Sequence, residues 1–592
     1  MKFAFLIIVL VLTTTVLAQD IINQGNITLL ALMENGTTQS GGVAVLSLEI
    51  RPGRERVFLE TYPMTKITTQ ASLRFAQQVA CDELDIDCSR YDFLFTIEAL
   101  PGIVGGPSAG GAATMLTSAL LLNKTLDQHM GMTGTINSGG IVGPVGGLRY
   151  KLDAAAGAGI KRVYVPNGIK AISVGNETLN LVEYGERLNL TVREVDTIQE
   201  VLAEETGKAL PPENQTLAID QQYSVIMREV AKDLCERAIN FSRNPLAINA
   251  TAADNFTQRA NNALENNASY SAASYCFRAN VEYKKVIYAA RNFSANVLAG
   301  QSHALRTDAE RSRVIVDNRT LTTLTDLQTY MAVRERIDES IILLDLVDAD
   351  LAKGKLDTQG IAFVEERLFS ARTWSRFFGG NGKNLALDTA ELQSGCTAKI
   401  SEAEERYNYV KSVLPDALEG TRKDIDAAYG FLNLERYGLC IHTAAKAKAE
   451  ADVLLSLMGV EELRLTDLVS LKLRVAKHAL AKVQAKDVFP IIAYSYYEYA
   501  DSLKDFDPAS ALLFSEYALE LANLDIYFHK NEPSGRLTAV STSDWAYSSS
   551  EIAILVIVAL IAFITGRRSA LPEESRKTLQ APPKRRLRGK KR

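Results

Sequence analysis

The sequence predicts an α+β domain, an all-α domain and a single C-terminal transmembrane helix, in that order along the chain. Before residue 206, glycine-rich and β-branched segments such as GGVAVLSLEI and KRVYVP alternate with helical patterns such as SLRFAQQVACDEL. This alternation is typical of an α/β or α+β domain. Beyond residue 216 glycine becomes scarce and the pattern is helical, and close to the C-terminus a run of uncharged apolar residues predicts the membrane span.

Composition limits what the chain can be. Of 592 residues, 47% are hydrophobic and 23% are charged, which supplies two or three packed domains and excludes wholesale disorder. The predicted boundaries are an α+β domain at 19–205, a linker at 206–216 (TGKALPPENQT), a helical domain at 217–530 and a juxtamembrane linker at 531–546.

The first residues, MKFAFLIIVLVLTTTVLAQD, predict a secretory signal peptide over 1–18, cleaved after Ala18. Lys2 is its short charged region, and an apolar run and small residues follow. The alternatives are a buried first strand or an uncleaved anchor. A cleaved signal would place the domains that follow outside the cytoplasm.

Within the helical domain, a hairpin is expected near residue 507. Asp507 is suited to cap a helix, with Pro508 at its first position, and apolar residues then recur at spacings of three and four as far as Phe528. The tyrosine-rich segment 490–506 is the expected partner helix, and its tyrosines are expected to be core. Such hairpins resemble tetratricopeptide arrays, although no 34-residue period is evident.

The predicted transmembrane helix covers 547–566, with Trp545 at the outer interface. The tail at 567–592 holds 11 Lys or Arg against 2 Glu, which marks it as cytoplasmic by the positive-inside rule. Nucleic acid is the alternative partner for this tail, but attraction to anionic lipid is favoured, and no other basic cluster indicates nucleic-acid binding. The expected location is the cell membrane, single-pass, with the N-terminal domains outside.

Sequons and cysteines agree with that location. Twelve N-x-S/T sequons all lie before residue 321, which predicts a glycoprotein; they are at Asn26, Asn35, Asn123, Asn176, Asn189, Asn214, Asn240, Asn249, Asn255, Asn267, Asn292 and Asn318. Six cysteines without close CxxC spacing predict disulfides rather than a zinc site. Of fifteen possible pairings, the sequence-local set 81–88, 235–276 and 396–440 is expected, with free buried thiols as the alternative.

The stretch LPGIVGGPSAGGAAT, residues 100–114, raises the question of function. Ser108 could be the nucleophile of a G-x-S-x-G elbow, part of a phosphate cradle, or a residue in a tight turn. A Walker phosphate loop would require Lys-Ser or Lys-Thr after its last glycine, whereas Gly111 is followed by two alanines. A histidine-based triad is not evident among the five histidines, and neither an HExxH sequence nor a cluster of metal ligands occurs.

A serine without a histidine still needs a base, and a desolvated lysine can act as one. Lys151 is the candidate, at the start of a helical stretch of small residues that follows the glycine-rich segment IVGPVGGLRY. Taken alone, Lys151 would be interpreted as a solvated surface lysine.

Together these motifs resemble the proteolytic domain of the Lon protease family. The resemblance rests on GPSAGG around Ser108, on MTG followed by isoleucine, on IVGPVGGLRYK, on AAAGAGIKRVYVP, and on the 43-residue separation of Ser108 and Lys151. It is specific over residues 100–167 and weaker over 25–205. No Walker A sequence occurs in the chain, so the overall organisation resembles ATPase-lacking, membrane-anchored Lon-like proteins of archaea.

The resemblance implies a Lon-type α+β domain with a Ser–Lys dyad. Ser108 would be the nucleophile and Lys151 the general base and then the general acid, while Thr133 in the MTG motif would orient the lysine. Backbone N–H groups at the start of the following helix would hold the oxyanion, with Gly106 and Ala109 as further candidates. No cofactor and no metal are expected, and the family suggests a homo-oligomer, a hexamer in Lon relatives.

The expected function is an ATP-independent serine endopeptidase, a hydrolase anchored to the outer face of the cell membrane. Its partners would be flexible or unfolded polypeptide substrates, with the helical domain as spacer, gate or docking surface. The alternative is a non-catalytic, glycosylated cell-surface protein that binds peptides or drives assembly.

Overall fold

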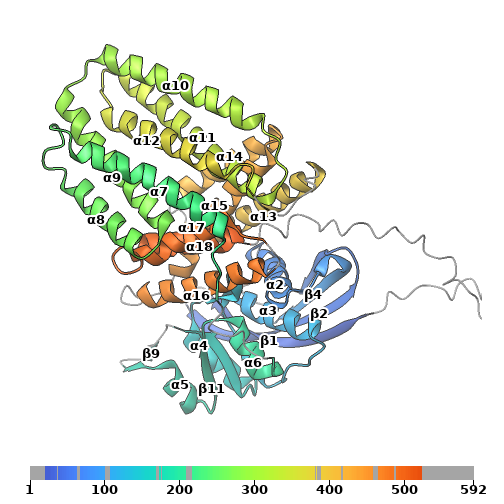
Figure 1. The fold of residues 1–592 in the computed structure, drawn as a ribbon. Coiled ribbons are helices and arrows are strands. Elements are labelled where there is room, and N and C mark those ends of the chain that lie inside the picture. Colours follow the sequence, from blue (N-terminus) through green and yellow to red (C-terminus); the bar gives the residue numbers. More distant parts are fainter. Residues whose placement is uncertain are drawn as a thin grey trace, which may run out of the picture. The chain divides into compact units, whose positions relative to one another are not determined.

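The computed structural model describes residues 21–522, apart from 36–37, 63–66, 100–106, 168–171, 175–176, 209–215, 381, 383–388, 415–417, 458–464 and 486–487. The predicted signal peptide, juxtamembrane linker, transmembrane helix and basic tail lie outside the described residues, and so does most of the predicted interdomain linker. The α+β region precedes residue 209 and the helical region follows residue 215 (Figure 1).

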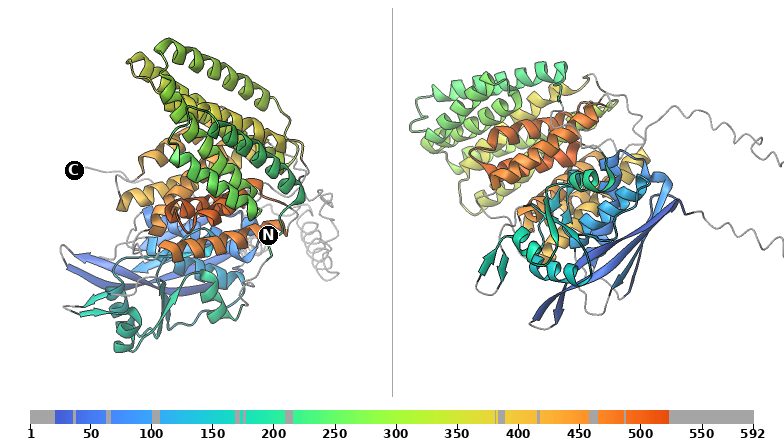
Figure 2. Two further views of the ribbon diagram at one scale, coloured as in Figure 1. Left: turned by 60° about the vertical axis from the view of Figure 1, so that its left-hand side comes forward. Right: turned by 90° about the horizontal axis from the view of Figure 1, so that it is seen from below.

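A seven-stranded mixed sheet forms the centre of the α+β region. Its order is β11-β8-β5-β1-β2-β4-β3. β1 and β2 form a long antiparallel hairpin (Figures 1 and 2), β2 pairs with β4 antiparallel, and the other neighbours are parallel. The strands are β1 (Asn23–Asn35), β2 (Thr38–Pro52), β3 (Val57–Tyr62), β4 (Tyr91–Ala99), β5 (Met130–Met132), β6 (Thr135–Ile136), β7 (Val142–Gly143), β8 (Arg162–Pro166), β9 (Ile172–Val174), β10 (Glu177–Leu179) and β11 (Thr191–Val195).

Helices cover both faces of this sheet. Because side chains alternate along a strand, Leu29 and Leu30 of β1 belong to different cores. Leu29 packs into the core shared with helices α2, α3 and α6, and Leu30 into the core shared with α4 and α5. These helices are α2 (Ile67–Leu84), α3 (Gly110–Leu121), α4 (Leu148–Gly157), α5 (Leu181–Arg187) and α6 (Ile198–Thr206). The α+β part of the predicted fold is confirmed.

Twelve helices make up the described helical region, and most pack against a neighbour in sequence, as helical hairpins do. They are α7 (Gln221–Ser242), α8 (Thr251–Glu265), α9 (Ser269–Arg291), α10 (Ala295–Asp317), α11 (Leu324–Ala352), α12 (Thr358–Trp374), α13 (Thr389–Val413), α14 (Glu419–Asn433), α15 (Tyr437–Leu457), α16 (Leu465–Gln484), α17 (Ile491–Leu503) and α18 (Pro508–Ala522). The helices α13, α16 and α18 also contact the α+β region, at α2 and at the short 3-10 helix η3 (Ser138–Gly140).

The predicted hairpin near residue 507 is the pair α17 and α18. Asp507 caps the second helix, since its Oδ1 accepts a hydrogen bond from the Ser510 N–H at 3.1 Å. Tyr494, Tyr496 and Tyr499 of the first helix are all less than a tenth exposed, so the tyrosine stripe is core, as expected.

Three disulfides link the six cysteines in the sequence-local pairing, 81–88, 235–276 and 396–440. That prediction is confirmed. One bridge lies in the α+β region and two tie neighbouring helices in the helical region.

The predicted transmembrane helix is the part of the fold class that is wrong. In the portion of the chain that the structure describes, no helix combines the length and the apolar character needed to cross a membrane, and the predicted segment 547–566 is not within that portion. The physical reason is charge: a span needs about 20 mostly apolar residues. Even the 29-residue α11 carries Arg334, Glu335, Arg336, Asp338 and Glu339 in its middle. The described fold is therefore an α+β region followed by a helical region.

Candidate active site

Ser108 lies where the chain enters helix α3. It is half-buried in the short 3-10 helix η2 (Pro107–Ala109), which leads directly into α3. The Ser108 carbonyl accepts a hydrogen bond from the Gly134 N–H at 3.1 Å, and the Gly111 N–H donates to the Gly134 carbonyl at 2.9 Å. These two bonds fix the serine segment against the chain that follows β5.

Glycines at the start of α3 permit this close approach. A Cβ atom on Gly110 would lie 2.9 Å from Cγ2 of Ile136, and one on Gly111 would lie 2.9 Å from Cε of Met132. A larger residue at position 110 would push the serine segment away from β6, whereas at position 111 the end of the flexible Met132 side chain would have to move aside. The glycines of the GPSAGG motif therefore have a packing role in addition to their expected role in catalysis.

Lys151 lies in the first turn of α4 and is buried, with 3% of its surface exposed. Gly147 precedes this helix in the left-handed conformation, at φ 69°, and its carbonyl accepts a hydrogen bond from the Lys151 N–H at 3.1 Å. The Nζ atom of Lys151 donates a hydrogen bond to Oγ1 of the fully buried Thr133 at 2.9 Å.

The environment of Lys151 favours a neutral amine. Burial lowers the pKa of the Lys151 ammonium to about 8. Among the described residues, no carboxylate forms an ion pair with it. The positive end of the α4 helix dipole also disfavours the positive charge of the Lys151 ammonium in the first turn. With this pKa about a tenth of the Lys151 side chains are neutral at pH 7, a far larger fraction than for an exposed lysine.

The structure thus brings together three of the five predicted site residues. Gly134 is bonded to the backbone of Ser108, and the neighbouring Thr133 is bonded to the side chain of Lys151. Ala109 immediately precedes α3, where the first backbone N–H groups have no partner within the helix. The Gly111 N–H already donates to the Gly134 carbonyl, so it is not available to an oxyanion. Gly106 lies outside the described residues.

Sequence analysis missed a set of contacts from the helical region to the strand that follows Thr133. Arg406 of α13 is 8% exposed; its Nη2 donates a hydrogen bond to the Ile136 carbonyl at 3.0 Å, and its Nε pairs with Asp452 at 3.1 Å. The Asn137 side-chain amide donates to Ser456 Oγ at 3.2 Å. These partners are more than 250 residues away in sequence, so no local pattern could have indicated them.

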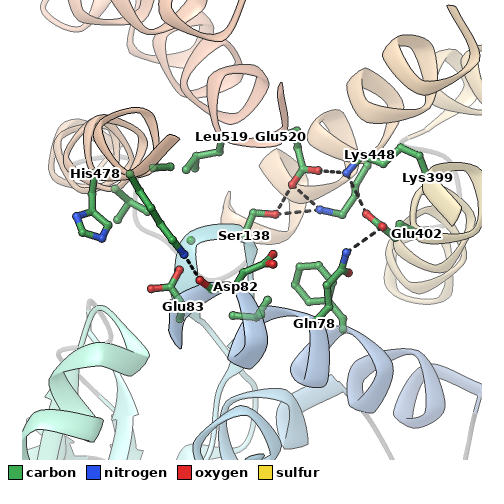
Figure 3. A pocket seen from close by; sticks show the side chains of 16 residues that line it. Gln78, Asp82, Glu83, Ser138, Lys399, Glu402, Lys448, His478, Leu519 and Glu520 are labelled. Carbon is green, nitrogen blue, oxygen red and sulfur yellow. Dashed lines mark hydrogen bonds and ion pairs between the residues drawn. The ribbon is translucent and has the colours of Figure 1, made fainter. Parts of the chain in front are cut away.

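A buried ion cluster continues this contact at η3. Figure 3 shows Ser138, Lys448 and Glu520 pointing toward one another. The Ser138 hydroxyl donates to Glu520, Lys448 Nζ donates to Ser138 Oγ at 2.9 Å, and Lys399 Nζ donates to Glu520 at 2.8 Å. Burial alone would raise the pKa of Glu520, but the attraction of Lys399 and Lys448 lowers it, so this carboxylate is charged.

The carboxylates of Asp452, Glu516 and Glu520 approach one another closely enough to suggest a metal site. Each of them, however, already has a cation within ion-pair distance. Arg406 pairs with Asp452, Lys472 pairs with Glu516 at 2.7 Å, and Lys399 and Lys448 pair with Glu520. The donor set therefore fits an internal salt-bridge network better than a metal ion.

Comparison with known proteins identifies the α+β region. Residues 81–207 match the family described as Lon protease (S16) C-terminal proteolytic domain. The chain is 30% identical over 188 residues to the Lon protease of Methanosphaera stadtmanae, an alignment that covers 31% of this chain and 22% of that protein. It is 34% identical over 135 residues to the Lon protease of Paraburkholderia phytofirmans, which covers 22% and 17% of the two chains.

A shorter match of 61 residues to the Lon protease of Phenylobacterium zucineum is 49% identical, covering 10% of this chain and 8% of that protein. The chain therefore spans less than a quarter of the length of these relatives. The family match covers the region in which the motifs around Ser108 and Lys151 predict a Lon-type proteolytic domain, and the helical region lies beyond it.

Proposed function

We propose that this chain is an ATP-independent serine endopeptidase that uses Ser108 as nucleophile and Lys151 as base on flexible or unfolded polypeptides. The observation that carries the proposal is the buried Lys151. Its ammonium pKa is lowered to about 8 by burial, and its Nζ is held by Thr133, beside the segment bonded to Ser108. A lysine with no role in catalysis would gain from exposure to water.

The reaction would proceed through two acyl transfers. As Ser108 Oγ attacks the peptide carbonyl carbon, its proton moves to the neutral Nζ of Lys151. The tetrahedral intermediate collapses when Lys151 gives this proton to the leaving amine, which leaves an ester on Ser108. Water then attacks the ester with Lys151 again accepting the proton, and the carboxylate product and free Ser108 are formed.

Two groups would orient the reaction. A neutral amine has one lone pair, and Thr133 Oγ1 fixes that lone pair by accepting one of the amine hydrogens. Backbone N–H groups at the start of α3, near Ala109, would stabilise the oxyanion, which is usually the largest contribution to acyl-transfer catalysis.

ATP independence is supported by the sequence, because no phosphate-binding loop occurs in these 592 residues. Without nucleotide-driven unfolding, a folded substrate would not thread into the site. Flexible polypeptides are therefore the proposed substrates, and the homo-oligomer implied by Lon relatives belongs to the same proposal.

An extracytoplasmic location and glycosylation are also proposed. Three disulfides form and persist in oxidising compartments. Glycans require exposed asparagines, and all nine sequon asparagines whose side chains are described are exposed; they are Asn26, Asn123, Asn189, Asn240, Asn249, Asn255, Asn267, Asn292 and Asn318.

The test is degradation of an unstructured protein such as casein by the purified chain, with the Ser108→Ala variant as control. We expect wild-type protein to cleave casein at the same rate with and without ATP and magnesium, and to leave a tightly folded protein intact. Equal cleavage by Ser108→Ala would refute the nucleophile, and marked stimulation by ATP would refute the energy-independent mechanism. No cleavage at all would favour the non-catalytic alternative.

A further inference from the structure

The helical region contains a large aromatic cavity that the proposed reaction does not use. Its volume is about 530 Å³, and residues of α9, α11, α12, α17 and α18 are among those that line it. Nine aromatic side chains contribute to the lining, with Tyr270 within 5.8 Å of Trp374 and 6.1 Å of Tyr499, ring centre to ring centre. A cavity of this size and composition is typical of a site for a small organic group.

Most charged groups of the lining neutralise one another. Lys285 pairs with Glu282 at 2.8 Å, Lys446 pairs with Glu335, and Arg367 pairs with Glu339. Arg336 is the exception among the buried cations of the lining. Its side chain is only 6% exposed, yet no carboxylate in the described part of the chain forms an ion pair with it.

The bonds that Arg336 does make leave part of its guanidinium available. Nε donates to Ser370 Oγ at 3.2 Å, Nη1 donates to the Ala332 carbonyl at 2.6 Å, and the group stacks 4.5 Å from the centre of the Trp374 ring. Nη2 donates to no described residue. Burial and the nearby charge of Arg367 lower the pKa of Arg336, so an anion bound beside it in the cavity would stabilise its charged form.

Tyr499 supplies a second unsatisfied group in the same lining. Its side chain is 3% exposed, and its hydroxyl has no hydrogen-bond partner among the described residues. An unpartnered buried hydroxyl destabilises a protein unless a ligand or water bonds to it. Tyr270 contacts both Trp374 and Tyr499, so the two unsatisfied groups belong to one continuous aromatic surface.

We infer that this cavity binds an aromatic group that carries a carboxylate, with Arg336 as the carboxylate partner, Trp374 and Tyr270 as aromatic contacts and Tyr499 as a further hydrogen-bond donor. If the proposed function holds, the source of this group is the C-terminal residue of a polypeptide, because every polypeptide ends in a carboxylate. The helical region would then capture the end of an unfolded chain while the dyad cleaves elsewhere along it. Bidentate contact with a carboxylate is the geometry that a guanidinium favours.

Ligand binding in this cavity can be followed by the fluorescence of Trp374. The chain has two tryptophans, so the full-length protein with Ser108→Ala and Trp545→Phe would report on Trp374 alone and would not cleave the probe. The probes are a short glycine–serine peptide that ends in phenylalanine, as the free acid and as the amide, together with N-acetylphenylalanine. We expect a saturable change in Trp374 emission with the peptide acid and about 10-fold or more weaker binding of the amide, since a charge-assisted hydrogen bond is lost.

Single substitutions test the contributions of Arg336 and Tyr499 to binding separately. Arg336→Gln should weaken binding of the peptide acid about 10-fold or more, and Arg336→Lys, which retains the charge, should weaken it less. Tyr499→Phe should weaken binding about 3- to 10-fold without lowering the melting temperature, because it removes a hydroxyl that has no partner in the protein. The matched control is Tyr497→Phe, on the same helix and outside the lining, which should leave affinity unchanged.

Each result is decisive. Equal affinity for acid and amide, or an unaltered affinity in Arg336→Gln, would overturn the carboxylate site. No change in emission with any probe would show that the cavity holds only water. N-acetylphenylalanine presents the same ring and carboxylate as the peptide acid, so failure of this probe to bind where the peptide acid binds would contradict recognition of the terminal residue. Binding is measured in the Ser108→Ala background and does not depend on cleavage. A failure of the protease proposal would therefore not change the binding result, and a failure to bind would not refute the protease proposal.

Discussion

Lys151 and Thr133 are joined by a buried hydrogen bond of 2.9 Å, from the amine in the first turn of α4 to the hydroxyl that follows β5. The pair lies 18 residues apart in sequence, and both side chains are almost wholly shielded from water. This bond is available to the lysine in either protonation state, but only the neutral amine retains a lone pair for Ser108. Protonation of Lys151 should therefore control the reaction.

The pH dependence of turnover follows from this control. Because the pKa of Lys151 is lowered to about 8, kcat/KM for a short peptide should rise about tenfold per pH unit below that value and level off above it. The measurement is a profile between about pH 6 and pH 10 on wild-type protein, with Lys151→Arg as an inactive control, since arginine does not lose its proton in this range. A flat profile, or activity in Lys151→Arg, would exclude the lysine as base.

Replacement of Thr133 by valine should impair catalysis while the fold persists. Valine has nearly the same shape but cannot accept the hydrogen bond from Lys151 Nζ, so we expect turnover to fall about 10- to 100-fold, or roughly 1.4 to 2.7 kcal/mol of transition-state stabilisation. Thr133→Ser retains the oxygen and should retain most of the activity. Wild-type turnover in a folded Thr133→Val protein would show that this residue serves packing alone.

Replacement of Lys151 by methionine should abolish activity and increase stability near neutral pH. Below about pH 8 the lysine is charged in both the folded and the unfolded protein, and its burial opposes folding by roughly 3 kcal/mol. Between that pKa and the ordinary value of 10.5 the folded protein binds fewer protons than the unfolded one, so wild-type stability rises with pH. Urea unfolding at about pH 7 and pH 10 should thus show an advantage for Lys151→Met that shrinks as pH rises. An advantage independent of pH would indicate a different cause.

Arg406 should matter for both folding and turnover, although it belongs to the helical region. Arg406→Met leaves the Asp452 carboxylate and the Ile136 carbonyl without this partner, and breaking such a buried pair typically costs about 3 to 5 kcal/mol. We expect a lower melting temperature and slower cleavage even of a short peptide. The matched control is Arg422→Met on α14, whose ion pairs with Glu404 and Asp426 are more exposed.

A double variant distinguishes the two effects of Arg406. Arg406→Met with Asp452→Leu removes both charges and should recover much of the lost stability, as buried ion pairs replaced by apolar residues often do. Turnover should stay low, because the Ile136 carbonyl still lacks the hydrogen bond that fixes the strand after Thr133. Recovery of both properties together would show that Arg406 affects catalysis only through stability.

The features that sequence predicted well are local ones. The disulfide pairs are at most 44 residues apart, and the Asp507 cap and the α17–α18 hairpin follow from residue types at fixed spacing. The positions of Ser108, Thr133 and Lys151 could be predicted as a group only because their motifs resemble a known domain. Spacing alone would have left Lys151 as a surface residue.

The features that sequence did not reveal depend on distant side chains. Ser138 and Glu520 are 382 residues apart, and a polar serine in a glycine-rich segment gives no sign that a buried carboxylate will meet it. Arg336 looks like any charged residue in the helical pattern of α11, and only the structure shows that it is buried without an ion pair to a described carboxylate. An uncharged apolar run predicted the membrane helix, yet none of the described helices is long and apolar enough to cross a membrane.

The contact between Ser138 and Glu520 has a consequence for the protein during its synthesis. A ribosome makes the proteolytic domain first and reaches α18 only near residue 520. Until that helix has emerged, the segment after Thr133 lacks Glu520, and earlier in synthesis it also lacks Arg406 and Lys448. A nascent chain therefore contains Ser108 and Lys151 without the full set of contacts that order their surroundings. Proteolytic competence would therefore arise late, after translation of nearly all of the described chain, and a product truncated before α18 would lack it.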